Sequence, residues 1–480
     1  MAGRTTKNMT DGSPMKLILG FLIPMLFGLL FQQLYNMMDT IIVGKYLGVN
    51  ALASVGSTGS INFMIVGFCI GVCSGFAIPV AQSFGEKNER ALRRYVANSG
   101  WLAAIFSAVM TMVVCLLCRN ILGWMKTPKD IFDGAYAYIF VIFLGIPATC
   151  LYNIPAGIIR SMGDSTTPLI FLLISSVMNI VLDLFTILVL KMGVAGAAWA
   201  TVISQGISGI LCFFYMKKNY SVLKMEGDEW KPDLRTMKTL CNMGIPMGLQ
   251  YSITAIGSVV LQTAVNSLGA VAVASVTAAG KISMLFCCPF DAMGTTMATY
   301  GGQNLGARKL DRIQKGVRDC TILGAGYALL AYVVIFFFSD TIALLFVNHS
   351  ETEILRNSRQ FLLANAAFYF PLALINILRF MIQGLGYSRL AILAGVSEMA
   401  ARTLMGFCLV PLFGFQAVCF ANPLAWIAAD LFLIPAYFWV MRRLYRMIKN
   451  TRQEAQTREH RQNEKHKQKH RHKPKATAAL

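Results

Sequence analysis

Residues 175–190 read SSVMNIVLDLFTILVL, an apolar run of the kind that crosses a lipid bilayer as a helix. The run nevertheless contains Asn179 and Asp183. A carboxylate near the middle of a membrane helix costs at least about 2.5 to 3.5 kcal/mol on insertion scales, and such residues usually mark an ion or proton path. We therefore expect that the protein spans a membrane and that Asp183 has a functional role there.

The composition of the whole chain is also that of a membrane protein. Of its 480 residues, 56% are hydrophobic and only 14% are charged, whereas a soluble domain is about a quarter charged. A formal net charge of +20 would suit nucleic acid. The excess, however, lies mainly in short loops and in a basic tail after Trp439. This distribution predicts control of topology and contact with membrane lipid, and no nucleic-acid partner.

Twelve apolar runs predict an all-α polytopic membrane protein with twelve transmembrane helices. The runs cover residues 15–39, 52–82, 94–118, 134–159, 167–190, 194–216, 238–265, 273–301, 317–347, 360–383, 390–411 and 416–440. We divide the chain into an N-terminal segment (1–13), an N-lobe of six helices (14–216), an inter-lobe loop (217–237), a C-lobe of six helices (238–441) and a basic, disordered tail (442–480).

Lysine and arginine predict the orientation of these spans. They gather after even-numbered runs, as with Lys87 and Arg90 after the second and Arg308 after the eighth, while Arg379 and Arg389 flank the loop after the tenth. Loops after odd-numbered runs carry few positive charges. By the positive-inside rule, both termini and the even-numbered loops should face the cytoplasm, in a protein of the cell membrane.

The two halves of the chain repeat each other. The segment IPMLFG at 23–28 corresponds to IPMGLQ at 245–250, RSMGDS at 160–165 to QGLGYS at 383–388, and KMGVAGAAWA at 191–200 to LFGFQAVCFA at 412–421, with offsets of 221 to 223 residues. Since each half has an even number of spans, the lobes should share one orientation. They should then be related by a pseudo-two-fold axis along the membrane normal, with a substrate path between them.

Polar residues in the first half fall on single helical faces. In the first run these are Gln32, Tyr35, Asn36 and Asp39, in the fifth Asn179 and Asp183, and in the sixth Ala197 and Thr201. If the faces converge, Asp39, Asn179, Asp183 and Thr201 form an oxygen-lined pocket. Such a pocket suits a sodium ion, or a proton shared by two carboxylates. A hydrogen-bonded helix-packing network is the alternative. Pro24, early in the first run, is a candidate hinge.

The second half differs at the corresponding positions. It has an apolar stretch near Val260 in place of Asp39, Arg402 and Gly406 in place of Asn179 and Asp183, and Asn422 in place of Thr201. The ion site is therefore expected in the N-lobe. Glu398 and Arg402, four residues apart, are either a neutralising ion pair or a second gate or substrate contact.

The quoted motifs resemble the multidrug and toxic compound extrusion (MATE) family. LYNMMDTIIVGKYLG at 34–48 resembles the end of its first helix, GDSTTP at 163–168 the loop between its helices four and five, and GQNLGARKLDRI at 302–313 the loop between its helices eight and nine. The resemblance covers about residues 14–445. It implies two six-helix lobes around a cleft that opens to each side in turn, and the exchange of cationic, amphipathic compounds for sodium or protons.

The resemblance also implies a set of site residues. The archaeal and DinF-like branches use an aspartate on helix one, an Asn-x-x-x-Asp pair on helix five, and Ala and Thr on helix six. Asp39, Asn179, Asp183, Ala197 and Thr201 match that set. The NorM-like branch has an acidic residue on helix seven, where this chain has Thr254. We expect no cofactor other than the coupling ion, small organic cations as substrates, and a monomer.

Three other functions are weighed against this one. A flippase for lipid-linked sugars would need a basic central cavity, and Arg402 is the main arginine that the sequence predicts inside the membrane. An intramembrane enzyme would need a metal site or a nucleophile–base pair, yet all five histidines lie outside the predicted spans and the motifs HExxH and GxSxG are absent. A receptor that does not transport would not need the internal repeat.

Overall fold

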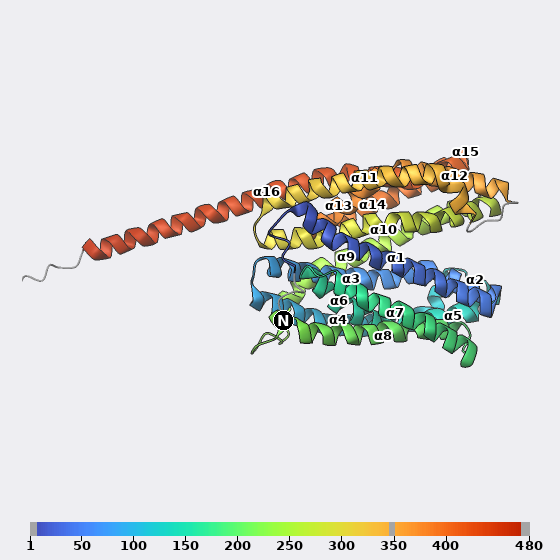
Figure 1. Ribbon diagram of the computed structural model, residues 1–480, viewed down its shortest axis with the longest axis horizontal. Coiled ribbons are helices and arrows are strands. Elements are labelled where there is room, and N and C mark those ends of the chain that lie inside the picture. The colour runs from blue at the N-terminus through green and yellow to red at the C-terminus, as the bar shows by residue number, and fades with distance from the viewer. Residues whose placement is uncertain (1–6, 345–350, 472–480) are drawn as a thin grey trace, which may run out of the picture. The chain divides into compact units, whose positions relative to one another are not determined.

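The computed structural model describes residues 7–344 and 351–471, and every regular element in those ranges is a helix (Figure 1). The helices are α1 (Pro14–Leu47), α2 (Val49–Ser57), α3 (Gly59–Gly85), α4 (Glu89–Trp124), α5 (Lys129–Leu144), α6 (Ile146–Ser161), α7 (Thr166–Leu184), η1 (Phe185–Val189), α8 (Val194–Asn219), η2 (Ser221–Leu223), α9 (Leu234–Asn266), α10 (Ala270–Gly306), α11 (Leu310–Ala343), α12 (Thr352–Ala367), α13 (Tyr369–Gly384), α14 (Ser388–Leu404), η3 (Met405–Leu409), α15 (Val410–Phe413) and α16 (Phe415–Arg471).

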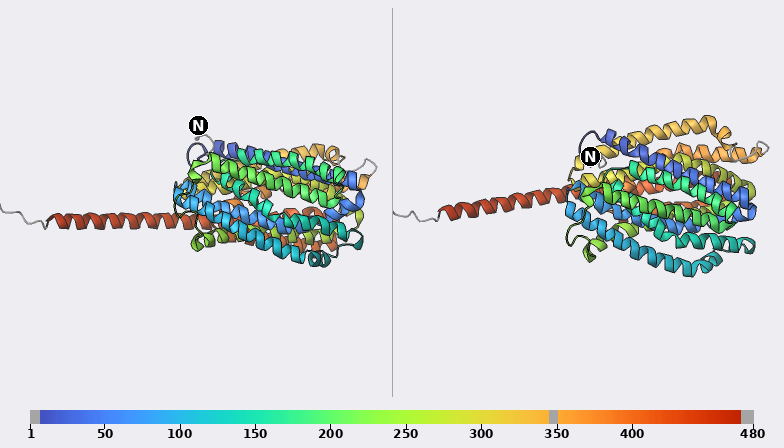
Figure 2. Two further views of the ribbon diagram at one scale, coloured as in Figure 1. Left: turned by 90° about the horizontal axis from the view of Figure 1, so that it is seen from below. Right: turned by 60° about the horizontal axis from the view of Figure 1, so that its bottom comes forward.

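The described helices account for the predicted spans. Ten are long and apolar enough to cross a bilayer alone, and two bent pairs, α5–α6 and α12–α13, bring the number to twelve if each pair is one span. The first pair bends by 44° and the second by 51°. The all-α, twelve-span architecture that the sequence predicts is thus confirmed, and the two views of Figure 2 show the long helices of residues 14–434 running side by side.

The internal repeat is visible in irregular features of the helices. The bends of the two pairs fall at Gly145 and Phe368. Each half also contains a five-residue π-helix, Phe185–Val189 directly after α7 in the first half and Met405–Leu409 directly after α14 in the second. Because π-helices are rare and frequently mark functional sites, their matched placement points to one ancestral half-fold.

Glycines bring the two lobes into close contact. A Cβ atom on Gly75 of α3 would lie 2.4 Å from the Cα atom of Gly244 in α9, and one on Gly248 would lie 2.7 Å from the carbonyl oxygen of Phe68. Gly71 faces Met247 in the same way. Small residues four apart let membrane helices approach until their backbones touch, and here they join the first lobe to the second.

The last helix extends beyond the predicted C-lobe. The chain divides into two compact units, one that ends at Ile434 and one that begins at Pro435. Within the second unit, α16 remains helical to Arg471, through most of the tail that we expected to be disordered. Residues 472–480 of that tail, and residues 1–6 of the N-terminal segment, lie outside the described residues.

Candidate ion and substrate site

The predicted polar faces of the N-lobe meet in one cluster. The Asn179 side chain of α7 donates to the Thr201 hydroxyl of α8 at 3.2 Å, and that hydroxyl donates to the Ala197 carbonyl oxygen at 3.2 Å. Asp183, one turn after Asn179, is fully buried. Its carboxyl group lies within hydrogen-bonding reach of the carboxyl group of Asp39 on α1. The structure therefore brings all five residues of the expected set together.

The oxygens of this cluster lack donors. Asp39 Oδ1, Asn179 Oδ1 and both carboxylate oxygens of Asp183 are buried without a hydrogen-bond partner among the described residues. Nor does any described cation pair with either aspartate. Buried polar atoms in proteins are nearly always paired, and two close carboxylates cannot both remain ionised without compensation. The arrangement fits a bound proton or a cation with oxygen ligands.

The additional residues of the first helix separate into two groups. Gln32, Tyr35 and Pro24 line a cavity beside the cluster, and the Tyr35 hydroxyl lies near the Gln205 amide, Asp39 and Asp183. Asn36 is exposed and outside the cavity lining. The helix α1 passes through Pro24 without a break, and the hinge there stays a prediction.

The cavity lies between the N-lobe and the facing helices of the C-lobe and has a volume of about 240 Å³. Helices α1, α3, α6, α7 and α8 form most of its wall, and α9, α10 and α13 contribute Met247, Tyr251, Thr295, Thr299 and Phe380. Hydroxyl and amide groups dominate the polar part of this wall. Among the described lining residues Arg160 is the single charged one.

The C-lobe has a polar centre of a different kind. Arg379 of α13 donates to Glu398 of α14, and Arg402 Nη2 lies 3.5 Å from the other oxygen of Glu398. Asp430 of α16 lies within electrostatic reach of Arg379 and Glu398. Thus Glu398 and Arg402 form the neutralising pair that the spacing predicted as one of two options. Among the described residues, neither side chain contacts the N-lobe cluster.

The position of Arg379 corrects an expectation. The sequence suggested that Arg379 flanks a loop with Arg389, as part of the positive-inside pattern. In the structure, Arg379 is only 6% exposed within α13, because its guanidinium is drawn to Glu398 on the neighbouring helix. The helix ends five residues later, at Gly384.

The lobes are joined at the basic end of the molecule, the end that carries Lys87, Arg90, Arg308 and Lys309. Gln82 of α3 donates to the Gly384 carbonyl oxygen at 2.9 Å, and Gln303 of α10 donates to the Ser161 carbonyl oxygen at 2.8 Å. These two bonds correspond to each other under the repeat, since each glutamine reaches the end of a helix in the opposite lobe. The contact has the isologous form expected about a two-fold axis.

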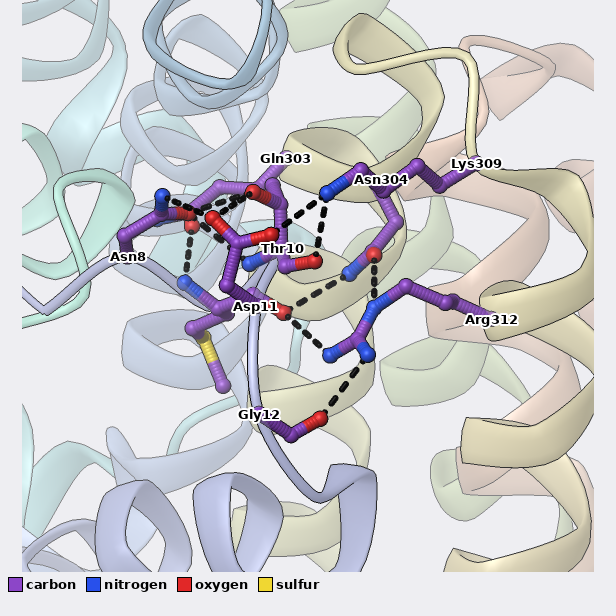
Figure 3. A network of polar contacts seen from close by, with 9 residues as sticks. Asn8, Thr10, Asp11, Gly12, Gln303, Asn304, Lys309 and Arg312 are labelled. Carbon is purple, nitrogen blue, oxygen red and sulfur yellow. Dashed lines mark hydrogen bonds and ion pairs between the residues drawn. The ribbon is translucent and has the colours of Figure 1, made fainter.

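The N-terminal segment crosses to the second lobe at this end (Figure 3). The Met9 amide donates to the Gln303 side chain at 2.9 Å, and Asn304 and Arg312 donate to the Met9 carbonyl oxygen at 3.2 Å each. Lys309 pairs with Asp11 at 2.6 Å. On its other side the Lys7 amide donates to the Met162 carbonyl oxygen of the N-lobe. Residues 7–12 therefore hold the two lobes together.

The segment before α9 makes the corresponding crossing to the first lobe. Glu229 accepts from Arg93 of α4 at 2.6 and 3.1 Å, and the Asp233 amide donates to Asn98 at 2.8 Å. The hydrogen bond and charge of Arg93 lower the pKa of Glu229, and those of Lys309 lower the pKa of Asp11. In both segments the carboxylate form is the one that the contact stabilises.

Comparison with known proteins now decides the family. The MatE family model matches residues 24–185 and, a second time, residues 246–408. The chain belongs to the MatE family. The two matches are 222 residues apart, which agrees with the repeat that the helices display.

Relatives of this MatE protein bear names of drug exporters. It is 27% identical over 339 residues to "Probable multidrug resistance protein YoeA" of Bacillus subtilis, covering 69% of this chain and 73% of that protein. It is 28% identical over 380 residues to "Probable multidrug resistance protein YpnP" of the same organism, covering 78% and 83%. The fold matches "Outward-facing conformation of a multidrug resistance MATE family transporter of the MOP superfamily" with a TM-score of 0.83 at 22% identity, covering 93% and 100%. The MatE protein is thus a multi-pass membrane transporter of small molecules and not an enzyme.

Sequence reasoning missed four charged residues of this MatE protein that the structure places within membrane-spanning helices. They are Arg160, Asp291, Arg379 and Asp430. Asp291 and Asp430 stand in apolar runs (CCPFDAMG and WIAADLFL), and the same cost argument that singled out Asp183 could have found them. Arg160 and Arg379 lie near the ends of apolar runs, where an arginine normally indicates a loop.

Proposed function

We propose that this MatE protein exports small amphipathic organic compounds in exchange for sodium ions or protons, and that Asp39 and Asp183 bind the coupling ion. The observation that carries the proposal is the set of buried, unpartnered oxygens on Asp39, Asn179 and Asp183. Two close carboxylates without a counter-charge are stabilised when a cation or a proton binds to them. Binding and release of the ion therefore change the charge and the packing of the site.

Coupling between this site and the cavity runs through Tyr35 and Gln205. Tyr35 lies near both carboxylates and Gln205, and Gln205 accepts from Thr149 at 2.8 Å. All three side chains also line the cavity. A change in the charge of the aspartates therefore reaches the cavity wall through one tyrosine. The membrane supplies the driving force, because one charge moved across 100 mV is worth about 2.3 kcal/mol.

The proposal also covers the orientation of the protein in the membrane and the conformation that it adopts here. The basic end faces the cytoplasm, both termini are cytoplasmic, and the hydrogen bonds from Gln82 to Gly384 and from Gln303 to Ser161 close the cytoplasmic side. In this conformation the ion site is reached from outside. Release of the Lys7–Gly12 segment and of Gln303 opens the cytoplasmic side. The protein works as a monomer in the cell membrane, and the basic tail contacts anionic lipid.

The test is transport by purified protein in liposomes. Amphipathic dyes of different charge are followed under an imposed sodium gradient and, separately, a pH gradient. We expect one gradient to drive dye movement in the wild type. Asp39→Asn and Asp183→Asn should each abolish the dye movement that the gradient drives. A side-chain amide does not bind a proton near neutral pH, and it carries no charge that attracts a cation.

The matched control is Asp340→Asn. Asp340 is exposed and pairs with Arg359 at 2.7 Å, away from the site, so its loss should leave coupled transport unchanged. If both aspartate variants transport like the wild type under the same gradient, Asp39 and Asp183 are structural and the ion site is elsewhere. If no gradient moves any dye in the wild type, export itself is the wrong function.

A flippase for lipid-linked sugars remains the second candidate. The observation that favours it is Arg160, which gives the cavity a basic residue that the sequence did not predict. Reconstitution with a fluorescent polyprenyl phosphate tests it: accumulation in the opposite leaflet that depends on the protein would favour the flippase, and unchanged leaflet asymmetry would exclude it.

A further inference from the structure

Arg160 is a half-buried cation on the wall of the cavity. It stands in the last turn of α6, and its side chain faces the cavity. No hydrogen bond or ion pair of its guanidinium occurs among the described residues. A charged residue in a membrane interior is almost always paired, or lines a path for a substrate or ion. Arg379 and Arg402 follow the first rule, since both meet Glu398.

The repeat shows how unusual this position is. The residue that corresponds to Arg160 in the second half is Gln383, by the alignment of RSMGDS with QGLGYS. Gln383 is fully buried and donates to Gln250 at 2.5 Å. The C-lobe thus fills this position with an amide that has a partner, while the N-lobe fills it with a charge that has none in the part of the chain that the structure describes.

A second unpartnered donor approaches Arg160 from the opposite lobe. The Tyr251 hydroxyl of α9 lies within electrostatic reach of the Arg160 guanidinium. Tyr251 lines the same cavity, and its hydroxyl makes no hydrogen bond among the described residues. Its ring is held edge-on by Phe63, 6.2 Å away between centroids. Donors from both lobes are therefore directed into one space.

We propose that Arg160 and Tyr251 bind an oxyanion, the carboxylate or phosphate group of the exported compound. This inference rests on the proposed function and names the substrate class. The guanidinium presents five N–H donors in a planar fork that matches carboxylate and phosphate oxygens. The cavity wall offers no described carboxylate that would repel the group or bind a cation instead.

The inference revises the expectation of a purely cationic substrate. Asp291 is a candidate partner for a cationic group of the substrate. It lies on the same face of α10 as Thr295 and Thr299, one turn before these cavity-lining residues. It is exposed, and its carboxylate has no partner among the described residues. A zwitterion places its anionic group at Arg160 and its cationic group toward Asp291. Because Arg160 and Tyr251 belong to different lobes, the bound oxyanion also bridges them.

The experiment compares two dyes that differ only in the proposed group. A xanthene dye with a free carboxylate and its methyl ester are measured for binding to purified protein and for transport in liposomes. Arg160→Gln should weaken binding of the carboxylate dye by on the order of tenfold to a hundredfold, the range for hydrogen bonds to a charged partner. Binding of the ester should not weaken. Arg160→Lys should restore part of the loss, since it keeps the charge without the fork.

Two further variants separate the subsite from general effects. Tyr251→Phe should weaken binding of the carboxylate dye by roughly threefold to tenfold, as expected for one neutral hydrogen bond. Lys281→Gln removes a positive charge from α10 outside the cavity wall and should leave the preference for the carboxylate dye unchanged. Equal losses for both dyes in Arg160→Gln would overturn the inference, because they would show a structural role.

The source of the oxyanion is distinguished by competition. A soluble organic phosphate and a polyprenyl phosphate in lipid nanodiscs are each tested against the bound carboxylate dye. Competition by either one supports the subsite and identifies a soluble or a lipid source, and competition by neither overturns it. If gradients drive the ester but not the carboxylate dye, ion-coupled export stands and this inference fails. If neither dye moves, the export function fails with it.

Discussion

The two lobes of this MatE protein share one fold but hold their buried charges in opposite ways. In the N-lobe, Asp39 and Asp183 face each other, and no described lysine or arginine pairs with either carboxyl group. In the C-lobe, Arg379 and Arg402 enclose Glu398. Both arrangements follow the same α-helix and π-helix pattern in the fifth span of their lobe. The repeat therefore supplies the scaffold, and the side chains placed on it decide how the buried charges of each lobe are compensated.

The physical difference is one of compensation. A buried carboxylate that already contacts two guanidinium groups gains little from a further cation, whereas removal of one partner leaves an uncompensated buried charge. Two carboxylates without donors are in the reverse situation, and a proton or cation lowers their free energy. The C-lobe cluster is thus expected to stabilise the fold, and the N-lobe cluster to change with its ligand.

The largest expected effect contrasts the same chemical change in the two lobes. Glu398→Gln should lower the free energy of unfolding by about 3 to 5 kcal/mol, because it removes the carboxylate that Arg379 and Arg402 both contact while the two arginines stay buried. Asp183→Asn removes a charge that has no partner and should not destabilise the protein, although it abolishes coupling. The measurement is thermal unfolding in detergent, together with transport in liposomes.

A double variant sharpens this contrast. Glu398→Gln combined with Arg402→Gln should recover part of the lost stability, since it restores the charge balance that the single change disturbs. A stability loss for Asp183→Asn as large as that for Glu398→Gln would contradict the distinction between a structural and a ligand-binding cluster.

The next prediction concerns the place where the lobes behave alike. A Cβ atom on Gly85 would lie 1.9 Å from the Gln303 carbonyl oxygen, and one on Gly306 would lie 1.9 Å from the Gln82 carbonyl oxygen. Gly85→Ala and Gly306→Ala should each disfavour closure of the basic end by about 1 to 3 kcal/mol, the usual cost of overpacking. Labelling of cysteines introduced in the cavity, measured from the basic end, reports the closure.

Gly85→Ala and Gly306→Ala should disfavour closure of the basic end to the same extent. Gly20→Ala serves as the control, because a Cβ atom there meets nothing within 4 Å and alanine favours the middle of a helix. A strong effect at Gly306 with none at Gly85 would mean that the reciprocal contact is not shared equally by the halves.

A smaller effect should separate the two glutamines at the same end. Gln303 is fully buried, donates to Ser161 and also accepts from the Met9 amide, whereas Gln82 makes the single bond to Gly384. Gln82→Ala should lower the free energy of unfolding by about 1 kcal/mol. Gln303→Ala should lower it by about 2 to 3 kcal/mol, because it also leaves the buried Met9 amide without an acceptor. Thermal unfolding measures both, and equal losses would show that the N-terminal segment contributes nothing to closure.

The smallest effect depends on pH. Lys309 lowers the pKa of Asp11, and Arg93 lowers that of Glu229. A carboxyl group whose pKa is lower in the folded state stabilises the fold above its unfolded pKa and loses this contribution as the pH falls through the folded value. The difference in melting temperature between wild type and Glu229→Gln or Asp11→Asn should therefore be present at pH 7 and disappear well below pH 4. A difference that persists there would exclude an ionic contribution.

The sequence alone determined the spans, the repeat and the N-lobe residues that share a helical face. These features depend on local periodicity: a helix needs about 20 apolar residues to cross the bilayer, and residues three or four apart share its face. Asp39, Asn179, Asp183 and Thr201 could be named for this reason, and the family resemblance added Ala197. The cost of a charge in lipid made Asp183 conspicuous before any contact was known.

Only the tertiary structure decided which charges have partners. Arg379 and Glu398 are 19 residues apart on different helices, and Arg160 and Tyr251 belong to different lobes. Their relations depend on how helices pack, which the glycine contacts of α3 and α9 fix at the level of backbone atoms. Periodicity within one helix contains no information about its neighbour. The sequence therefore predicted where charges lie along each span, and packing determined that Arg379 meets Glu398 while Arg160 meets no acceptor among the described residues.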